Sequence, residues 1–460
     1  MPQTNNTAKI ILGPIIGGLS HERVNFWART NKSATLYAWL ATNRNGSNAK
    51  LVGKKQLQAS NGFAGMVTVT GLLPAKKYFF AFTLDPKPVP PKSAFRPLRT
   101  FPAPGKAKSF RFGFGSCFLP FTDSPGLTFK HIRENQPNLA FLLFLGDQIY
   151  ADNTKLNGLG RAPVTADEYR NVYRTVWSNP HYRELLANTP AFMILDDHEV
   201  DNDWHWNDRA HTEADTSWLT RVLRKLNGRP KEELHLSLAR TRAALKVNWE
   251  HQAMYAPAKV SPYGPLAYEF EYGSTAFFIL DTRTQRFINR RERQLLGDKQ
   301  WHMLEAWLKR IKDTHPIKFI ASSISVMSDF FGDITNDRWT GFDEERERLF
   351  TLIAREEVEG IHFLVGDLHS AHLITANIKT DSGRTIPIWE FCSSPFEQKS
   401  SSLALLMDYP TRSPRLQNQK RHYSVNRFNY GVVDVAFSKG ETPVVNFELY
   451  YTEDGKWIKK

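Results

Sequence analysis

Five apolar stretches of the sequence end in side chains that could bind metal ions. The stretch at 139–147 ends in Gly146-Asp147, and Tyr150 follows three residues later. Taken singly, such residues are turn, capping or structural residues. Several carboxylates at one edge of a sheet would repel each other, however, and a bound cation resolves that conflict. We therefore predict a metal centre from the stretch ends Gly115-Ser116-Cys117, Gly146-Asp147, Asp196-Asp197-His198-Glu199, Asp281-Thr282-Arg283 and Gly366-Asp367-Leu368-His369.

These stretches are predicted to be strands of an α/β sheet. They are apolar on both faces and alternate with helical patterns, which is typical of a sheet with helices on both sides. In such sheets ligands gather at the carboxyl ends of the strands. We expect strands within 111–117, 139–147, 191–197, 317–325, 361–367 and 386–394, a hairpin over 268–282, and helices over 127–135, 166–177, 297–311 and, with an interruption at 227–228, roughly 212–256.

The first hundred residues have a different pattern. Short alternating runs recur at 24–30, 34–42, 66–72 and 76–84, and turn residues separate them. Runs of this length and spacing are typical of a small β-sandwich. We therefore predict two domains, a β-sandwich over 1–104 and a larger α/β domain over 105–460.

Composition limits the class of protein. The 460 residues carry a formal net charge of +13, which favours anionic partners such as phosphorylated compounds, nucleic acid or lipid headgroups. Two cysteines, Cys117 and Cys392, are too few for a disulfide scaffold, and we expect Cys392 to lie in the core. No apolar stretch reaches the ~20 residues of a transmembrane helix. The N-terminus lacks the pattern of a signal peptide. We expect the cytoplasm if the sequence is complete, and the periplasm or the exterior if a leader is missing.

The motifs FGSC, GDQIYAD, DDHEVDND, DTR and GDLHSAH follow one another in this order. Together they resemble the PhoD-like alkaline phosphatases of the calcineurin-like metallophosphoesterase superfamily. The segments VTVTGLLPAKKYFFAF and LGDKQWHMLEAWL resemble the same family, so the resemblance covers nearly the whole chain. It implies an α/β (α+β) fold, in which a four-layer metallophosphoesterase-type β-sandwich is flanked by helices. A small all-β domain of the immunoglobulin or fibronectin type would precede it.

The resemblance also implies roles for individual residues. Fe(III) and Ca²⁺ are the ions it implies, because a phenolate and a thiolate suit Fe(III), whereas carboxylate and amide oxygens suit Ca²⁺. His198 would be the acid near the leaving group, and Arg283 and Arg286 would either clamp phosphate or form salt bridges. The implied ligands are Cys117, Asp147, Tyr150 and His369 for the first ion, and Asp147, Asp197, Asn202 and Asp367 for the second.

The activity implied is hydrolysis of phosphate esters by water activated between two metal ions. An alternative is a phosphodiesterase that acts on phospholipid, teichoic-acid-like or nucleic-acid diesters, with nucleic acid only as a substrate. A third is a catalytically silent binding protein that keeps the fold. Purple acid phosphatases are also similar, but they keep Asp-x-His and Gly-Asn-His-Glu motifs that this sequence lacks. The segment SSISV at 322–326 stands where the histidine for the second ion is expected, and His372 is a further candidate neighbour of the site.

Overall fold

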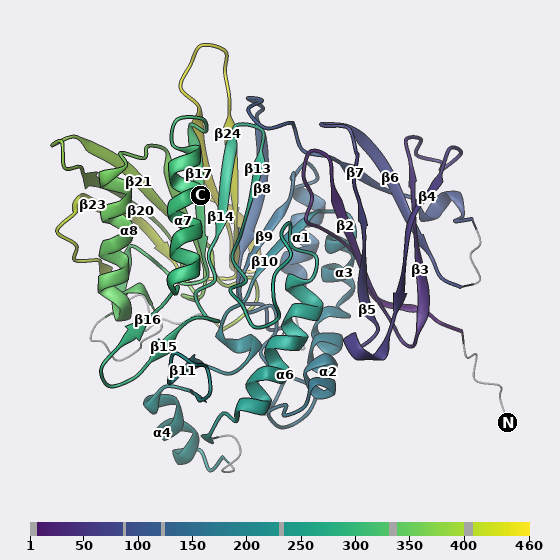
Figure 1. Ribbon diagram of the computed structural model, residues 1–460, viewed down its shortest axis with the longest axis horizontal. Coiled ribbons are helices and arrows are strands. Elements are labelled where there is room, and N and C mark those ends of the chain that lie inside the picture. Colours follow the sequence, from purple (N-terminus) through teal and green to yellow (C-terminus); the bar gives the residue numbers. More distant parts are fainter. Residues whose placement is uncertain (1–6, 86–88, 121–124, 230–233, 331–337, 400–407) are drawn as a thin grey trace.

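The core of the protein is a pair of large β-sheets covered by helices (Figure 1). The computed structural model describes residues 7–85, 89–120, 125–229, 234–330, 338–399 and 408–460. The first large sheet has the strand order β10-β9-β8-β24-β25-β26, and β8, β9 and β10 in it are parallel. Its strands are β8 (Phe110–Gly115), β9 (Leu142–Leu145), β10 (Ala191–Ile194), β24 (Asn429–Ala436), β25 (Val444–Glu453) and β26 (Lys456–Lys459).

The second large sheet has seven strands in the order β13-β14-β17-β19-β21-β20-β23. The strands β14, β17, β19 and β21 are parallel to each other, and the edges of the sheet are antiparallel. Its strands are β13 (Tyr268–Tyr272), β14 (Thr275–Ile279), β17 (Ile317–Ser322), β19 (Ile361–Val365), β20 (Ala371–Lys379), β21 (Thr385–Cys392) and β23 (Leu416–Val425).

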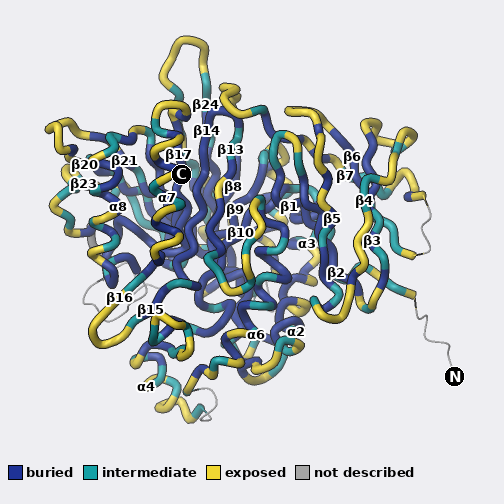
Figure 2. Tube along the Cα trace, in the orientation of Figure 1, coloured by how far each residue is buried: buried dark blue, intermediate teal, exposed yellow. Residues whose placement is uncertain are grey.

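The two sheets face each other across a core rich in phenylalanine. Phe112 of the first sheet lies with its ring centroid 5.4 Å from that of Phe277 and 5.2 Å from that of Phe319 in the second sheet. Alternate residues of the same strands point to the outer faces, which helices cover. Because the strands are apolar on both faces, burial is nearly complete through the middle of the molecule, as Figure 2 shows.

Helices form the two outer layers. The apolar cluster on the outer face of the first sheet contains residues of α1, α2, α3 and α6, and that on the second sheet contains residues of α7 and α8. The mixed α/β architecture predicted from the sequence is confirmed. The helices are α1 (Leu127–Asn135), α2 (Ala166–Trp177), α3 (Pro180–Leu186), α4 (Trp218–Leu226), α6 (Leu238–Asn248), α7 (Asp298–Ile311) and α8 (Asp343–Arg355).

The N-terminal part forms two smaller antiparallel sheets, β1-β2-β5 and β4-β3-β6-β7. They do not stand apart from the rest, because Trp27 of β2 packs in the same cluster as α2 and α3 and donates a hydrogen bond of 2.9 Å to the Glu250 carbonyl. The division at residue 104 stays a prediction. These strands are β1 (Ile10–Gly17), β2 (Val24–Thr30), β3 (Ala34–Ala41), β4 (Lys50–Leu57), β5 (Ala64–Val69), β6 (Lys77–Thr83) and β7 (Arg96–Arg99).

The predicted long helix over roughly 212–256 is wrong in its extent. The chain there forms the short strand β12 (Ala214–Asp215), then α4, and then α6 followed by a π-helical turn, while residues 230–233 lie outside the described part. Ser217 caps the N-terminus of α4, because its side chain accepts a hydrogen bond from the Thr220 amide. The helix therefore begins only after Ser217. Among the described residues, no helix is long and apolar enough to span a membrane.

Candidate metal centre

The carboxyl ends of the parallel strands meet at one edge of the two sheets, and the predicted site residues lie there. Cys117 follows β8, Asp147 follows β9 and Asp197 follows β10 in the first sheet, whereas Asp367 and His369 follow β19 in the second. Because both sheets end at this edge, residues 250 positions apart become neighbours. The Cys117 thiol, for example, lies 3.9 Å from the Asp367 carbonyl oxygen.

The backbone is strained at these positions. Cys117, Asp147, Asp367 and His369 have φ angles of 63°, 56°, 64° and 48°, in the left-handed region that L-residues rarely adopt. Each such residue costs of order 1 kcal/mol, and strain of this kind concentrates at functional sites. The sharp turns aim the four side chains back across the sheet edge and into one cluster.

Three of the residues predicted to hold the first ion form a tight group. One ligand atom each from Cys117, Asp147 and His369 lies within 4.8 Å of the others. The Cys117 Sγ is 3.5 Å from Asp147 Oδ2, and the phenol oxygen of Tyr150 is 3.0 Å from His369 Nε2. Thiol, carboxylate, imidazole and phenol groups thus lie close together at this edge.

A second group consists of carboxylates. Oxygens of Asp147, Asp196, Asp197 and Asp367 lie within 4.8 Å of one another, so Asp147 belongs to both groups. Asp196 belongs to one of the stretch ends predicted to form the centre, but it is not among the ligands that the family resemblance implies. It accepts a hydrogen bond of 2.9 Å from Ser323, in the segment where the sequence lacks the expected histidine.

The buried acidic groups of this site favour the binding of a cation. Burial and the Asp367 carboxylate raise the pKa of the Cys117 thiol to about 12, while burial and the neighbouring Cys117 and Asp197 raise the pKa of Asp147 well above its usual value. Burial lowers the pKa of His369 to about 3, so its imidazole is neutral, the form that binds metals. Ionising these donors in the buried site costs free energy unless a cation compensates their charge. The donor set therefore fits bound metal ions.

His198 lies beside both groups and is held by a carboxylate. Its Nδ1 is 2.7 Å from Asp152 Oδ1, and its ring centroid lies 4.1 Å from that of Tyr150. Burial alone would lower the pKa of His198, but Asp152 and Asp197 outweigh it and raise the pKa to about 10. Asp152, which had no assigned role, therefore orients the predicted catalytic histidine.

Glu199 is a second residue that the sequence analysis did not assign. Its buried carboxylate accepts hydrogen bonds from the backbone amides of Asp147, Gln148 and Asp196, at 3.1, 2.6 and 2.9 Å. It thereby joins the turns that follow β9 and β10. Its position three residues after Asp196, in a capping-box arrangement, is the local signal that could have revealed it.

Arg283 does not occupy the position expected of a phosphate clamp. Its guanidinium is fully buried, forms an ion pair with Asp196 and lies 3.5 Å from Asp197 Oδ1. It is not among the described residues that line the cavity at the site. Arg286 is also buried and lies over the Phe342 ring. Of the two readings left open for these arginines, the structure favours salt bridging for Arg283.

Asn202 lies in the wall of the cavity beside the donors, whereas His372 lies in the core. Asn202 lines the cavity, and its Nδ2 donates a hydrogen bond of 2.9 Å to Thr220 Oγ1. His372 is fully buried and lies 2.7 Å from the Glu390 carboxylate, so its contacts are structural. Cys392 is buried in the core, as expected.

The donors open onto a cavity of about 690 Å³. Tyr150, Asp152, His198, Asn202 and His369 line it next to the two groups. Four cationic side chains line it together with neutral residues such as Leu223, and positive charge in a cavity attracts anions. These cationic residues are Lys155, Arg224, Arg229 and Lys399.

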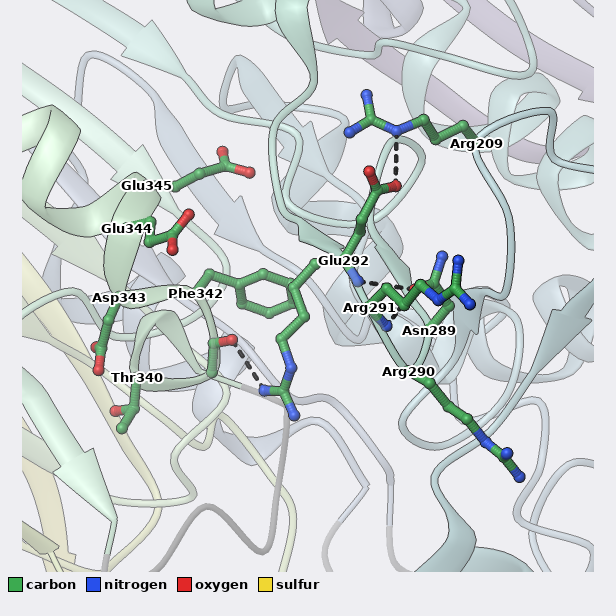
Figure 3. A pocket seen from close by; sticks show the side chains of 12 residues that line it. Arg209, Asn289, Arg290, Arg291, Glu292, Thr340, Phe342, Asp343, Glu344 and Glu345 are labelled. Carbon is green, nitrogen blue, oxygen red and sulfur yellow. Dashed lines mark hydrogen bonds and ion pairs between the residues drawn. The ribbon is translucent and has the colours of Figure 1, made fainter.

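A separate cavity of about 560 Å³ lies between the β15–β16 hairpin (Phe287–Ile288 and Arg293–Gln294) and the start of α8 (Figure 3). It contains several arginines, but it contains none of the residues predicted to bind metal. Its four arginines are balanced in number by four carboxylates, and Arg209 Nε lies 3.0 Å from Glu292. The 690 Å³ cavity is therefore the one that serves the candidate site.

Gly146 is needed where β9 turns into the site. Its φ is +96°, and a Cβ at this position would lie 2.4 Å from the Asp196 Cβ. We expect Gly146→Ala to lower the free energy of unfolding by ~2–4 kcal/mol, from backbone strain of ~1 kcal/mol plus overpacking of ~1–3 kcal/mol. Gly71→Ala is the matched control, because its φ is +73° and a Cβ there meets nothing within 4 Å. Equal losses in the two variants, measured by denaturant titration, would contradict the close-contact argument.

Comparison with known proteins identifies the family of this chain. The family model described as PhoD-like phosphatase matches residues 112–444. The chain belongs to the PhoD-like phosphatase family. Alkaline phosphatase D of Bacillus subtilis (strain 168) is 26% identical over 375 residues, which are 73% of this chain and 58% of that protein. The chain thus spans less than two thirds of that relative's length.

Solved structures show the same fold as this PhoD-like chain. The structure of PhoD has a TM-score of 0.69 at 20% identity, covering 100% of this chain and 93% of that one. A purple acid phosphatase, PPD1 from seeds of yellow lupin (Lupinus luteus), has a TM-score of 0.58 at 12% identity, covering 97% and 72%. The family predicted from the sequence motifs is confirmed.

Proposed function

We propose that this protein hydrolyses phosphate esters at the metal centre, with Fe(III) and Ca²⁺ as the bound ions. The observation that carries the proposal is the convergence of thiol, phenol, imidazole and carboxylate donors beside a cavity with a cationic wall. Membership of a phosphatase family supports it. The first ion would be held by Cys117, Asp147, Tyr150 and His369, and the second by Asp147, Asp197, Asn202 and Asp367.

When bound, such ions would polarise the phosphoryl oxygens and lower the pKa of a water molecule. The chain's own residues supply the rest. Lys155, Arg224 and Lys399 in the cavity wall attract the anionic ester. Asp152 contacts Nδ1 of His198, so that Nε2 is the atom left to give a proton to the leaving oxygen.

A second candidate activity is hydrolysis of phosphodiesters. The cavity extends beyond the donor groups to Arg229 and Lys399, which leaves room and positive charge for a second ester group. Phospholipid, teichoic-acid-like and nucleic-acid diesters would all present such a group, and nucleic acid would enter only as a substrate.

Hydrolysis of a chromogenic phosphomonoester and of the matching diester at alkaline pH tests the proposal. We expect turnover that is lost after treatment with a chelator and restored by adding Fe(III) and Ca²⁺, because the donors alone supply no Lewis acid. The ratio of the two rates separates phosphatase from diesterase. Full activity in chelated protein would contradict the metal centre, and no activity on either ester in metal-loaded protein would favour a silent binding protein.

We also propose that residues 1–104 form a domain of the immunoglobulin or fibronectin type. The two antiparallel sheets of this part, and the apolar cluster that Phe26, Leu36 and Phe80 share between them, support that classification.

A further inference from the structure

Helix α4 has its polar side turned inward. Thr220, Arg221 and Arg224 face the protein, where Thr220 donates a hydrogen bond of 2.5 Å to Asp203 and the two arginines form ion pairs with Asp215 and Asp201. An ordinary surface helix buries its apolar side and exposes its polar side. In α4 the carboxylates of Asp201, Asp203 and Asp215 bind the polar side, so the polar side faces the protein.

The apolar side of α4 is therefore exposed. Trp218 is 61% exposed and Leu226 78%, and Val222 and Leu223 between them are exposed as well. At 100° per residue these four side chains share one side of the helix. Figures 1 and 2 show α4 at one end of the molecule, with much of its surface exposed. A contiguous apolar surface of this kind marks a binding site for a partner.

This surface adjoins the candidate active site. Leu223 lines the same 690 Å³ cavity as His198 and His369. The inward side of α4 also contacts the site, because Arg224 Nη2 is 3.8 Å from Asp152, the carboxylate that holds His198. A partner that covers the apolar side of α4 would therefore lie across the mouth of the cavity.

The charge near the apolar surface indicates what that partner is. Lys225 on α4 and Lys155 and Lys399 at the cavity are exposed, and the whole chain carries +13. A helix with tryptophan and leucine on one side and basic residues beside them is typical of helices that lie in the surface of an anionic membrane. Tryptophan in particular favours the boundary between headgroups and acyl chains.

A second copy of the chain is a poorer candidate than a membrane for covering the apolar side of α4. The helix has nine residues and is only ~14 Å long, so its apolar strip is smaller than the ~800 Å² per partner of a stable protein interface. A lipid surface needs no such area, because one short helix inserts while basic residues bind headgroups.

We propose that the exposed apolar side of α4 docks the protein on an anionic lipid surface, with the active-site cavity facing that surface. Docking itself does not depend on catalysis. That the cavity then receives phosphoesters displayed at the surface rests on the function proposed above.

Co-sedimentation with vesicles tests the docking without any turnover. We expect the full chain to bind vesicles of phosphatidylcholine with phosphatidylglycerol more tightly than vesicles of phosphatidylcholine alone. Leu226→Glu is expected to weaken binding by at least about tenfold, because the burial of one leucine is lost. Leu73→Glu is the matched control, since it changes the charge equally at a residue that is 61% exposed in the β-rich N-terminal part. Trp218→Ser, with no charge change, is expected to weaken binding as Leu226→Glu does.

Three results would overturn the proposal. Wild-type protein could fail to sediment with either kind of vesicle, or Leu73→Glu could weaken binding as much as Leu226→Glu. The wild type could also be a dimer in light scattering that Leu226→Glu converts to monomer, which would make a second copy the occupant. Circular dichroism shows whether each variant is folded, and hydrolysis of a soluble ester shows independently whether the proposed activity exists.

Discussion

Asp147→Asn is expected to reduce phosphoester hydrolysis by more than about 100-fold. Asp147 is the one carboxylate shared by both groups of donors, so its loss affects both proposed ions. Even the loss of a residue that only supports a metal ligand typically costs about 10–100-fold. An asparagine keeps the size of the side chain but removes its charge.

The same variant is expected to fold at least as stably as metal-free wild type. Burial and the surrounding anions raise the pKa of Asp147, so a neutral amide relieves repulsion when no cation is present. Thermal unfolding of both proteins in chelator measures this, with Asp381→Asn at an exposed ion pair as the control. Activity that survives in Asp147→Asn, or a loss of activity explained by unfolding, would contradict the assigned role.

Arg283→Leu is expected to lower the free energy of unfolding by ~3–5 kcal/mol. The guanidinium is fully buried and paired with Asp196, and removing one partner of a buried ion pair leaves an uncompensated charge. Arg310→Leu is the matched control, because Arg310 is half exposed and pairs with Glu269 and Glu271. An exposed pair of this kind contributes about 1 kcal/mol or less.

Denaturant titration of metal-free protein measures both variants. If Arg283→Leu were as stable as wild type yet bound phosphate more weakly, the alternative role of Arg283 as a phosphate clamp would be correct. A large loss of stability in this variant alone supports the buried ion pair.

The location of the site was predictable because it depends on topology. Carboxyl ends of parallel strands share an edge, so Cys117, Asp147 and Asp367 were expected together from their positions after apolar runs. The direction of a side chain is not encoded in this way. Arg283 follows a strand as those residues do, but it forms a buried ion pair with Asp196 and is not among the described residues that line the cavity.

Helix α4 shows a second limit of sequence reasoning. Its spacing of apolar residues predicts one apolar side, and the usual inference is that this side is buried. The inference fails because Asp201, Asp203 and Asp215, which precede the helix in the chain, bind its polar side. Likewise, the change of pattern near residue 104 gave no sign that Trp27 packs against α2.

The metal content of the purified chain tests the central claim most directly. After loading with Fe(III) and Ca²⁺ and removal of free ions, elemental analysis should find one of each per chain in the wild type. Because Asp147 lies in both donor groups, Asp147→Asn should retain markedly less of both ions. Equal and low metal contents in the two proteins would contradict the existence of the metal centre.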